Sequence, residues 1–352
     1  MKCNHKLVVS FALLGSFAFA FNGCNKNVRQ SNNPNPFEER VLKEAKTNLD
    51  LSQITLRVGA SEGRNGQSVI KAAKLDNTPY KVDFNVLQSG NLTMSALSAH
   101  QLDLGTGSQI PPLFASQAAN GGNFKIIAIR KGATLDQELL IKKDSPIHSI
   151  SQLKGKRVAY VKGTTAQYFL AKMLKNAGLS WQDIDAIPTS TSDGLFALLS
   201  GKVDAYASYG NAVLTAHQKG AKTLESAEKI LSGDYYWYAT PAAINDPKKH
   251  AAIVDYLARY HEANEWAREH PEEWSEIYSN ENNQTPEDFL QILNQENKQS
   301  HARVAPIDEK TISSEKDIAD TFHDLKLLNN RGDIHEIFDD SFKAEIGKFT
   351  PY

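Results

Sequence analysis

The sequence predicts an α/β protein with two lobes, each a parallel-dominated sheet covered by helices, and a helical C-terminal tail on the first lobe. Strand-like and helix-like segments alternate from about residue 53 to about residue 208, which favours parallel sheets covered by helices. The same order of segments recurs after about one hundred residues, and the last third is mainly helical in pattern. A length of 352 residues leaves room for two such lobes.

The period of the apolar residues separates the expected strands from the expected helices. The expected strands cover residues 53–60, 81–87, 102–105, 156–161, 185–189 and 203–208. The expected helices between them cover residues 66–75, 91–100, 166–179 and 193–201. The two series also share residues at equivalent places, which favours two similar lobes. The matching pairs are Ala96 with Ala197, Leu97 with Leu198, Asp103 with Asp204 and Gly63 with Gly163.

The tail is expected to be helical over 247–274, with an interruption at Pro271, and again over 285–297 and 314–328. Thr285 is the expected N-cap of the second of these helices, because Pro286 follows it. A tail of this length needs an apolar surface to cover. The expected organisation is therefore a first lobe over 53–143, a second lobe over 144–238, and a return to the first lobe with the tail over 239–352.

The first 23 residues predict an export signal, because a basic start precedes an apolar run over 7–21. That run reaches roughly 22 Å as a helix, which is short of a ~30 Å bilayer core. Cleavage after Ala20 would release a soluble chain. Cleavage before Cys24, in a sequence similar to a lipobox, would leave a lipid-anchored chain in the periplasm. Residues 24–52 are then expected to be a flexible tether, and a stray thiol at Cys24 is the alternative to lipidation.

Composition excludes several classes of function. The net charge of −2 supplies no field for binding nucleic acid. Two cysteines, Cys3 and Cys24, exclude a disulfide scaffold and a cysteine zinc site. The histidines form no metal-binding pair, no P-loop occurs, and Ile110 replaces the third glycine of a dinucleotide fingerprint. No metal and no cofactor are expected, and the chain is expected to be a monomer.

Residues 59–63 fit the G-x-S-x-G pattern of a hydrolase, with Ser61 between a strand and a helix. This is the first strand of the fold, so no earlier strand supplies an oxyanion loop, and no triad partner is recognisable. A hydrolase that uses Ser61 remains an alternative function. A surface or assembly protein that binds no small molecule is another.

Two glycine-containing loops that open helices predict anion binding. They lie at 63–66 in the first series and at 163–165 in the second. A helix N-terminus presents unpaired N–H groups and the positive end of the helix dipole. Arg64, Lys162 and the hydroxyls of Ser61, Thr164 and Thr165 could complete a clamp between the lobes. The alternative is that these residues only turn the chain and cap the helices.

Aromatic residues at 234–238, with Tyr206 and Tyr209, could line a cleft for the organic part of such an anion. Ordinary strand packing is the alternative for each of them.

Several segments in order resemble the binding proteins of ABC importers for aliphatic sulfonates, taurine and nitrate. Residues 144–159 resemble the start of their second lobe, and K-G-T-T-A-Q-Y at 162–168 is similar to their K-G-S-N-A-H-Y loop. P-P-L-F-A at 111–115 resembles their P-P-I-F-A segment. Residues 265–273 resemble their tail helix, and residues 306–322 resemble the end of the sulfonate branch. The resemblance covers about residues 53 to 330.

The resemblance implies a type II periplasmic binding protein, a venus flytrap that closes by a hinge on an organic anion and performs no catalysis. Its partners would be an ABC permease and the ATPase subunits of that permease. An aliphatic sulfonate is the favoured ligand; a sulfate ester, nitrate and an aromatic or heterocyclic precursor are alternatives. The expected ligand-binding residues are Ser61, Glu62, Arg64, Ser89, Gly90, Gly107, Ser108, Gln109, Thr164, Thr165, Gln167, Tyr209, Asn211 and Trp237. Thr164→Ala and Arg64→Ala are expected to weaken binding without unfolding the chain.

This chain departs from the family pattern at the expected cleft. Residues 108–110 are Ser-Gln-Ile where relatives have G-D-T, and residues 209–211 are Tyr-Gly-Asn where relatives often have W-D-P. The identity of the ligand is therefore left open. Desulfinase-like enzymes of this fold use a cysteine near the first strand, and pyrimidine-synthesising relatives are cysteine-rich. No cysteine follows Cys24, which argues against both.

Overall fold

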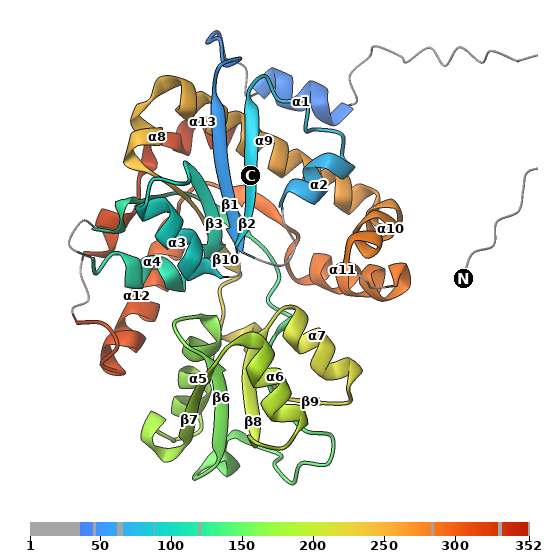
Figure 1. The fold of residues 1–352 in the computed structure, drawn as a ribbon, viewed down its shortest axis with the longest axis vertical. Helices are drawn as coiled ribbons and strands as arrows, with labels where there is room; N and C mark the ends of the chain where they lie inside the picture. The colour runs from blue at the N-terminus through green and yellow to red at the C-terminus, as the bar shows by residue number, and fades with distance from the viewer. Residues whose placement is uncertain are drawn as a thin grey trace, which may run out of the picture. The chain divides into compact units, whose positions relative to one another are not determined.

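The first of two sheets contains six strands in the order β11-β4-β10-β3-β1-β2 (Figure 1). β1 is parallel to β2 and β3, whereas β10 is antiparallel to β3 and β4. The strands are β1 (Thr55–Ser61), β2 (Lys81–Leu87), β3 (Leu104–Ser108), β4 (Lys125–Lys131), β10 (Asp234–Ala239) and β11 (Arg303–Ala305). The structure is a computed structural model that describes residues 36–44, 47–61, 66–87, 89–118, 121–282, 285–329 and 333–350. The predicted export signal, both cleavage sites and Cys24 lie outside these residues.

The second sheet contains five strands in the order β7-β6-β8-β5-β9. β6 is parallel to β7 and β8, and β5 is antiparallel to β8 and β9. The strands are β5 (Gln137–Ile141), β6 (Arg157–Val161), β7 (Asp185–Thr189), β8 (Ala205–Tyr209) and β9 (Lys222–Ser226).

The two sheets repeat one topology. In the first sheet the order β2-β1-β3 is followed by antiparallel β10, and in the second the order β7-β6-β8 is followed by antiparallel β5. The strand order and direction therefore confirm the predicted duplication of an α/β unit. In both sheets the fourth strand follows, along the chain, a strand of the other sheet, because β5 comes after β4 and β10 comes after β9. The chain therefore passes between the sheets at residues 132–136 and 227–233. These segments are called the crossing segments below.

The expected boundaries at 143/144 and 238/239 therefore differ from the structure. β5 belongs to the second sheet and β10 to the first. Each of these strands pairs with the sheet that the chain enters after the crossing. The boundaries were misplaced because a short apolar run in the sequence does not show which strands it will pair with.

Helices cover both faces of the sheets. They are α1 (Pro36–Glu44), α2 (Gly66–Ala72), α3 (Gly90–Ser98), α4 (Ile110–Ala115), α5 (Thr165–Asn176), α6 (Thr191–Leu199), α7 (Asn211–Gln218), α8 (Pro241–Asn245), α9 (Pro247–Glu269), α10 (Pro271–Asn282), α11 (Pro286–Ser300), α12 (Glu309–Asp324) and α13 (Lys343–Phe349). The 3₁₀ turns are Gly121–Asn123, Ile150–Leu153, Trp181–Asp183, Ala227–Lys229, Ile334–Ile337 and Asp340–Phe342. No helix in the described parts of the chain is long and apolar enough to cross a membrane.

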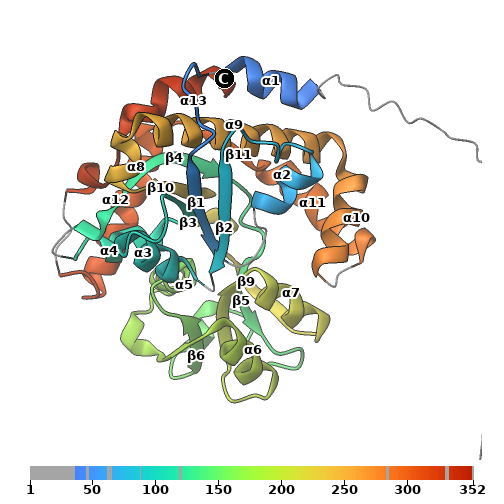
Figure 2. The ribbon, with the colours of Figure 1, turned by 45° about the horizontal axis from the view of Figure 1, so that its top comes forward.

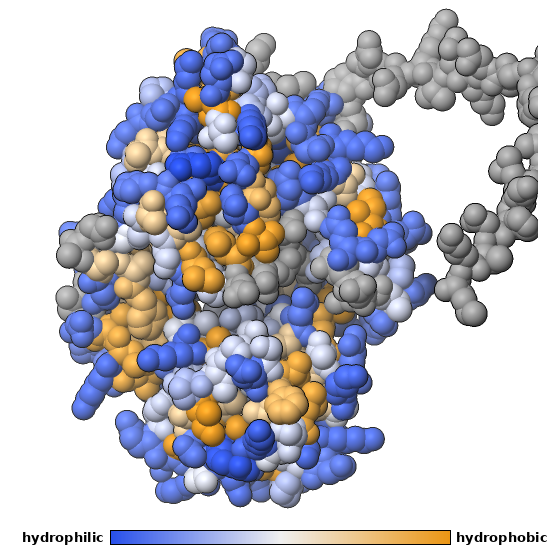
Figure 3. Space-filling model, viewed as in Figure 1, coloured by the Kyte–Doolittle hydropathy of each residue, from blue (hydrophilic) through white to orange (hydrophobic). Residues whose placement is uncertain are grey.

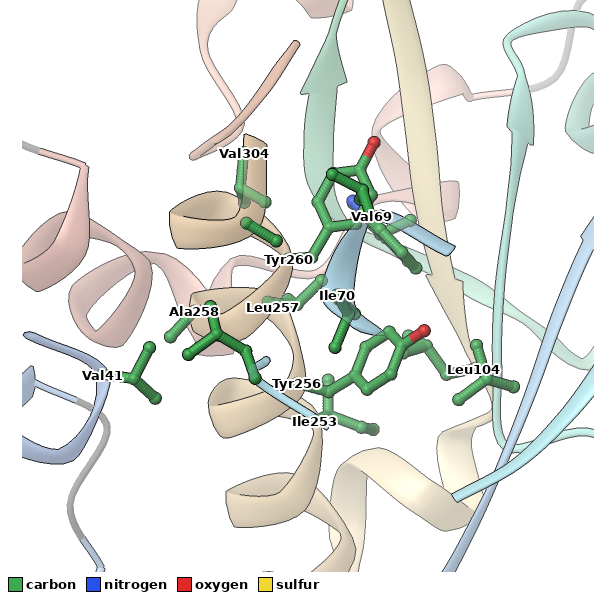
Figure 4. Packing of buried hydrophobic residues seen from close by; sticks show 14 of the residues in the cluster. Val41, Val69, Ile70, Leu104, Ile253, Tyr256, Leu257, Ala258, Tyr260 and Val304 are labelled. Carbon is green, nitrogen blue, oxygen red and sulfur yellow. The ribbon is translucent and has the colours of Figure 1, made fainter. Parts of the chain in front are cut away.

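The tail covers the first sheet, as predicted, and it does so on both faces. On one face, Ile253, Tyr256 and Leu257 of α9 share a core with Leu56 of β1 and Leu104 of β3 (Figures 2 and 4). On the other face, α12 and α3 pack with β3 and β4 in a second core. The helix is interrupted at Pro271 and Thr285 caps α11, both as predicted, because proline lacks an N–H and suits a first helical turn.

The expected tether over 24–52 is wrong for residues 36–44, which form α1. Phe37 and Val41 lie four residues apart, on one side of this helix, and join the core beside α9. Val41 is only 1% exposed. Two apolar residues at helical spacing are too few to distinguish a short packed helix from a polar linker.

Candidate functional site

A cleft with a volume of about 270 Å³ is lined by residues from both sheets (Figure 3). Ala60 of β1 and Ser108 of β3 reach it from the first sheet, and Tyr209 of β8 reaches it from the second. All three lie at the carboxyl ends of their strands. Ligands of open α/β sheets bind outside these ends, where the strand order reverses. β1 and β6 occupy that position in the two sheets.

The N-termini of two helices open onto this cleft. One helix, α3, packs on the first sheet, and the other, α5, packs on the second. Ser89 caps α3, and its Oγ accepts a hydrogen bond from the Leu92 N–H at 3.4 Å. Thr164 caps α5, and its Oγ1 accepts from the Ala166 N–H at 3.3 Å. The remaining N–H groups of each first turn and the positive ends of both helix dipoles favour an anion here.

A hydrogen-bonded chain joins α5 to the first sheet beside the cleft. Thr165 Oγ1 donates to Gln137 Oε1, and Gln137 Nε2 donates to the Tyr235 hydroxyl at 3.2 Å. The Tyr235 hydroxyl donates to the Ala133 carbonyl in a crossing segment at 3.3 Å. Burial, with the charge of Asp136 as a smaller cause, raises the pKa of Tyr235 to about 12. The phenol therefore remains a neutral donor at neutral pH.

Arg130 brings a positive charge to the cleft. It is opposite Tyr235 on the next strand, and Tyr235 is opposite Ser108 on β3, so the three residues form one row across the sheet. Its guanidinium carbon lies 4.0 Å from the centre of the Tyr235 ring, a cation–π distance. The buried Nε has no hydrogen-bond partner, and Arg130 forms no ion pair with any residue that the structure describes. A guanidinium without a carboxylate partner suits a tetrahedral oxyanion.

Five largely apolar side chains form another part of the lining, which we call the apolar wall. They come from α2, α9, α10 and α11, and none of them belongs to an element of the polar part described above. They are Val69, Tyr260, Ala267, Trp274 and Leu293. The lining also contains Arg268 and the carboxylates of Asp136 and Glu296, so the cleft combines charged groups of both signs with an apolar wall, as suits a small organic ligand.

Seven of the residues expected from the sequence line the cleft. They are Ser89, Gly90, Gly107, Ser108, Thr164, Thr165 and Tyr209. Ser61 ends β1, but its side chain lies outside the described residues, as do Glu62 and Arg64. Lys162 is exposed and is not part of the lining.

Four expected residues are placed elsewhere. Gln109 is buried beside the cleft, where its Nε2 donates to the Tyr236 hydroxyl at 3.0 Å. Gln167 Oε1 accepts from the Gly163 N–H at 2.8 Å and so holds the loop before α5. Asn211 is exposed at the start of α7.

Trp237 is 1% exposed and packs edge-on against Tyr260 in the core under α9. Side chains alternate along β10, so Trp237 faces α9 whereas Tyr236 and Tyr238 face α12. Of the expected aromatic segment, Tyr235 is the residue that lines the cleft.

Arg130 and the apolar wall were missed from the sequence. The apolar run Ile126 to Ile129, ended by Arg130, is a signal for a buried strand that ends in a charge. No comparable local signal marks the wall, because its residues also belong to the core of the helical tail. Within the described ranges, no group of three His, Cys, Asp or Glu residues could hold a metal ion.

Comparison with solved structures identifies the fold. The periplasmic aliphatic sulphonate binding protein SsuA from Escherichia coli has a TM-score of 0.74 and 22% identity, and the match covers 82% of this chain and 93% of that one. The desulfurization enzyme DSZB has the same fold at a TM-score of 0.61 and 15% identity, covering 82% of this chain and 97% of that one. The expected two-lobed binding-protein fold is confirmed.

Sequence relatives agree with this result. A protein of Escherichia coli (strain K12) that is named as an aliphatic sulfonates-binding protein is 26% identical over 288 residues, which are 80% of this chain and 87% of the relative. A protein of Bacillus subtilis (strain 168) with the same name is 24% identical over 335 residues, 94% of each chain. The model of the family described as NMT1/THI5 like matches residues 81–274, more than half of the sequence. The chain therefore belongs to the NMT1/THI5-like family.

Proposed function

We propose that this protein is the ligand-binding component of an ABC importer, and that it captures an aliphatic sulfonate in the cleft and delivers it to a membrane permease. The observation that carries the proposal is the pair of helix N-termini, α3 beside one sheet and α5 beside the other, that open onto one cleft. Arg130, whose guanidinium forms no ion pair with any described residue, lies in the same lining. The names of the sequence relatives supply the class of anion.

The three sulfonate oxygens would accept hydrogen bonds from the first turns of α3 and α5 and from Arg130. An anion held from both sides has more contacts when the cleft is closed, so binding shifts the protein toward its closed form. The chemistry is binding without turnover. The two cysteines both precede residue 35, and the described lining contains neither histidine nor cysteine.

The proposal includes export by residues 1–23 and lipid attachment at Cys24, which would hold a monomeric binding protein beside its permease and ATPase subunits. Support for these points comes from the sequence of the leader alone.

The test is calorimetric titration of the protein without its leader, after unfolding and refolding to remove carried-over ligand. The panel contains alkanesulfonates, taurine, a sulfate ester, nitrate and carboxylates. We expect tight, saturable binding of sulfonates and recovery of the ligand unchanged. Arg130→Ala is expected to weaken sulfonate binding about 10- to 100-fold, because a hydrogen bond to a charged group contributes about 1.5–3 kcal/mol.

Arg157→Ala is the matched control, because Arg157 lies in the second sheet, pairs with Asp204 and is not part of the cleft lining. Equal affinities of both variants for sulfonates would remove Arg130 from the site. Absence of sulfonate binding by the refolded wild-type protein would overturn the proposed function.

A further inference from the structure

We infer that Gln109 is a positioning residue, which sets the affinity of the cleft by holding the second crossing segment, 227–233, to the end of β3. The inference rests on the proposed function and goes beyond it, because it assigns a role to a residue outside the cleft. The side chain of Gln109 is only 4% exposed and is not part of the cleft lining. The two residues before it, Gly107 and Ser108, do line the cleft. A shift of Gln109 would therefore move residues that meet the ligand.

Partners on two other elements orient the side-chain amide of Gln109. Its Nε2 donates to the Tyr236 hydroxyl of β10 at 3.0 Å, and to Glu315 Oε2 and Ser314 Oγ of α12 at 3.3 and 3.4 Å. The Tyr236 hydroxyl has one proton, which it donates to Glu315 Oε2 at 2.7 Å, so toward Gln109 it can only accept. The amide nitrogen must therefore face Tyr236, which leaves the amide oxygen for a different partner.

That partner lies in the second crossing segment. Ser232 Oγ donates to Gln109 Oε1 at 2.8 Å, and it accepts from the Asp234 N–H at 3.1 Å. In the same segment, Ile230 and Leu231 pack against cores of both sheets. The bond from Ser232 thus joins a segment that both sheets share to the strand end that lines the cleft.

This link can act on affinity without a contact to the ligand. Residues of both sheets line the cleft, so the ligand meets all of them only when the crossing segments hold the sheets in one arrangement. Without the Ser232 bond the segment would adopt more arrangements, and a smaller fraction of the protein would be ready to bind. The apparent affinity falls by that fraction, and by the same factor for every ligand.

The test is calorimetry with methanesulfonate and butanesulfonate on the protein refolded as above. Ser232→Ala is expected to weaken binding of both ligands by the same factor, about two- to tenfold, which corresponds to the loss of one neutral hydrogen bond. Ser232→Thr keeps the hydroxyl at an exposed position and should restore the wild-type affinity. Ser314→Ala is the matched control. It removes a contact of the same amide with α12 rather than with the crossing segment, and it should leave the affinity unchanged.

A second pair of variants tests whether the effect passes through Gln109. Gln109→Met keeps the length of the side chain without its polar atoms, and it should also weaken binding of both sulfonates. Adding Ser232→Ala to Gln109→Met should cause no further loss, because the bond between the two side chains is already gone. If Gln109→Met does not fold, as judged by circular dichroism, the Ser232 and Ser314 variants decide the question.

Wild-type affinity in Ser232→Ala would overturn the inference and leave the proposed function intact. An equal loss in Ser314→Ala would do the same, because the effect would then not pass through the crossing segment. A loss that differs between the two sulfonates would also overturn it, because it would indicate a direct contact with the ligand. Failure of every sulfonate to bind the wild-type protein would overturn both the inference and the proposed function.

Discussion

At the scale of single residues, Glu315 is a titratable group whose pKa is strongly shifted. It is fully buried on α12, and its Oε2 accepts hydrogen bonds from the Tyr236 hydroxyl at 2.7 Å and from Gln109 Nε2 at 3.3 Å. Its Oε1 has no hydrogen-bond partner among the described residues. Burial, assisted by the nearby charge of Asp234, raises the pKa of Glu315 to about 8.

Glu315→Gln should therefore change how stability depends on pH. A carboxyl group with a pKa of about 8 in the folded state binds its proton more tightly there than in the unfolded chain, where the pKa is near 4.5. Its contribution to stability is complete below pH 4.5 and is lost as the pH rises to 8. Relative to the wild type, the variant should gain stability, on the order of a few kcal/mol, between pH 5 and pH 8.5.

Urea unfolding at the two pH values measures this difference. Subtracting the wild-type pH dependence from that of the variant removes the contribution of all other groups, including His261, whose pKa is lowered to about 4 by burial. A difference in free energy of unfolding that is the same at both pH values would show that Glu315 does not titrate in this range.

At the scale of elements, Arg259 joins α9 to the segment between α2 and β2. It is 1% exposed, and its Nε donates to Asp255 Oδ2 at 2.6 Å. Its Nη1 donates to the Leu75 carbonyl at 2.9 Å and to Asn77 Oδ1 at 3.0 Å, while the Tyr80 hydroxyl donates to Asp255 at 2.7 Å. A buried ion pair with all these partners ties the long helix to the edge of the first sheet.

Arg259→Met should lower the free energy of unfolding by about 3–5 kcal/mol, because it leaves the Asp255 carboxylate buried without its cation. Arg268→Met on the same helix is the control. Arg268 pairs with Glu265 at 2.6 Å, but its side chain is 42% exposed, so its loss should cost less than about 1 kcal/mol. Urea unfolding compares the two variants, and equal losses would contradict this account of how α9 is held.

At the scale of the whole molecule, the two crossing segments are bonded to each other. The Gly132 N–H donates to the Gly233 carbonyl at 2.9 Å. Gly233 has φ of +74°, and a Cβ there would lie 2.6 Å from the Gly132 carbonyl oxygen, so any larger residue must displace one crossing segment. The proposed closure of the cleft would move both segments, so ligand affinity should respond to this contact.

Gly233→Ala is therefore expected to weaken sulfonate binding about tenfold or more, in addition to lowering stability. Gly178→Ala is the control, since Gly178 also has φ of +74° but has no atom within 4 Å of the added Cβ. The free energy of unfolding of both variants should fall by about 1–2 kcal/mol, because alanine is strained in the left-handed backbone conformation. Calorimetry and urea unfolding separate the two effects. Wild-type affinity in Gly233→Ala would show that the crossing contact does not control the cleft.

The sequence predicted well those features that depend on a few neighbouring residues. The ten strands and helices expected between residues 53 and 208 are all present, with ends that differ by a few residues. Thr285 caps its helix, and the break at Pro271 is where it was expected. The missed elements include β4, β5, β9 and β11 and the short helices α1, α4, α7, α8 and α13. Short strands without alternation and short helices carry too few residues for their period to be read.

The sequence by itself determined the fold class, the repeated α/β order and the helix start at Thr164, because apolar period and capping residues act within one element. Only the tertiary structure decided which residues share the cleft. Arg130, Tyr235 and Ser108 form one row because β4, β10 and β3 pair, although about one hundred residues separate the first two. The apolar wall likewise joins α2 to α9, α10 and α11 across most of the chain. Strand pairing and helix packing between distant segments follow from burial of the whole core, which no local pattern contains.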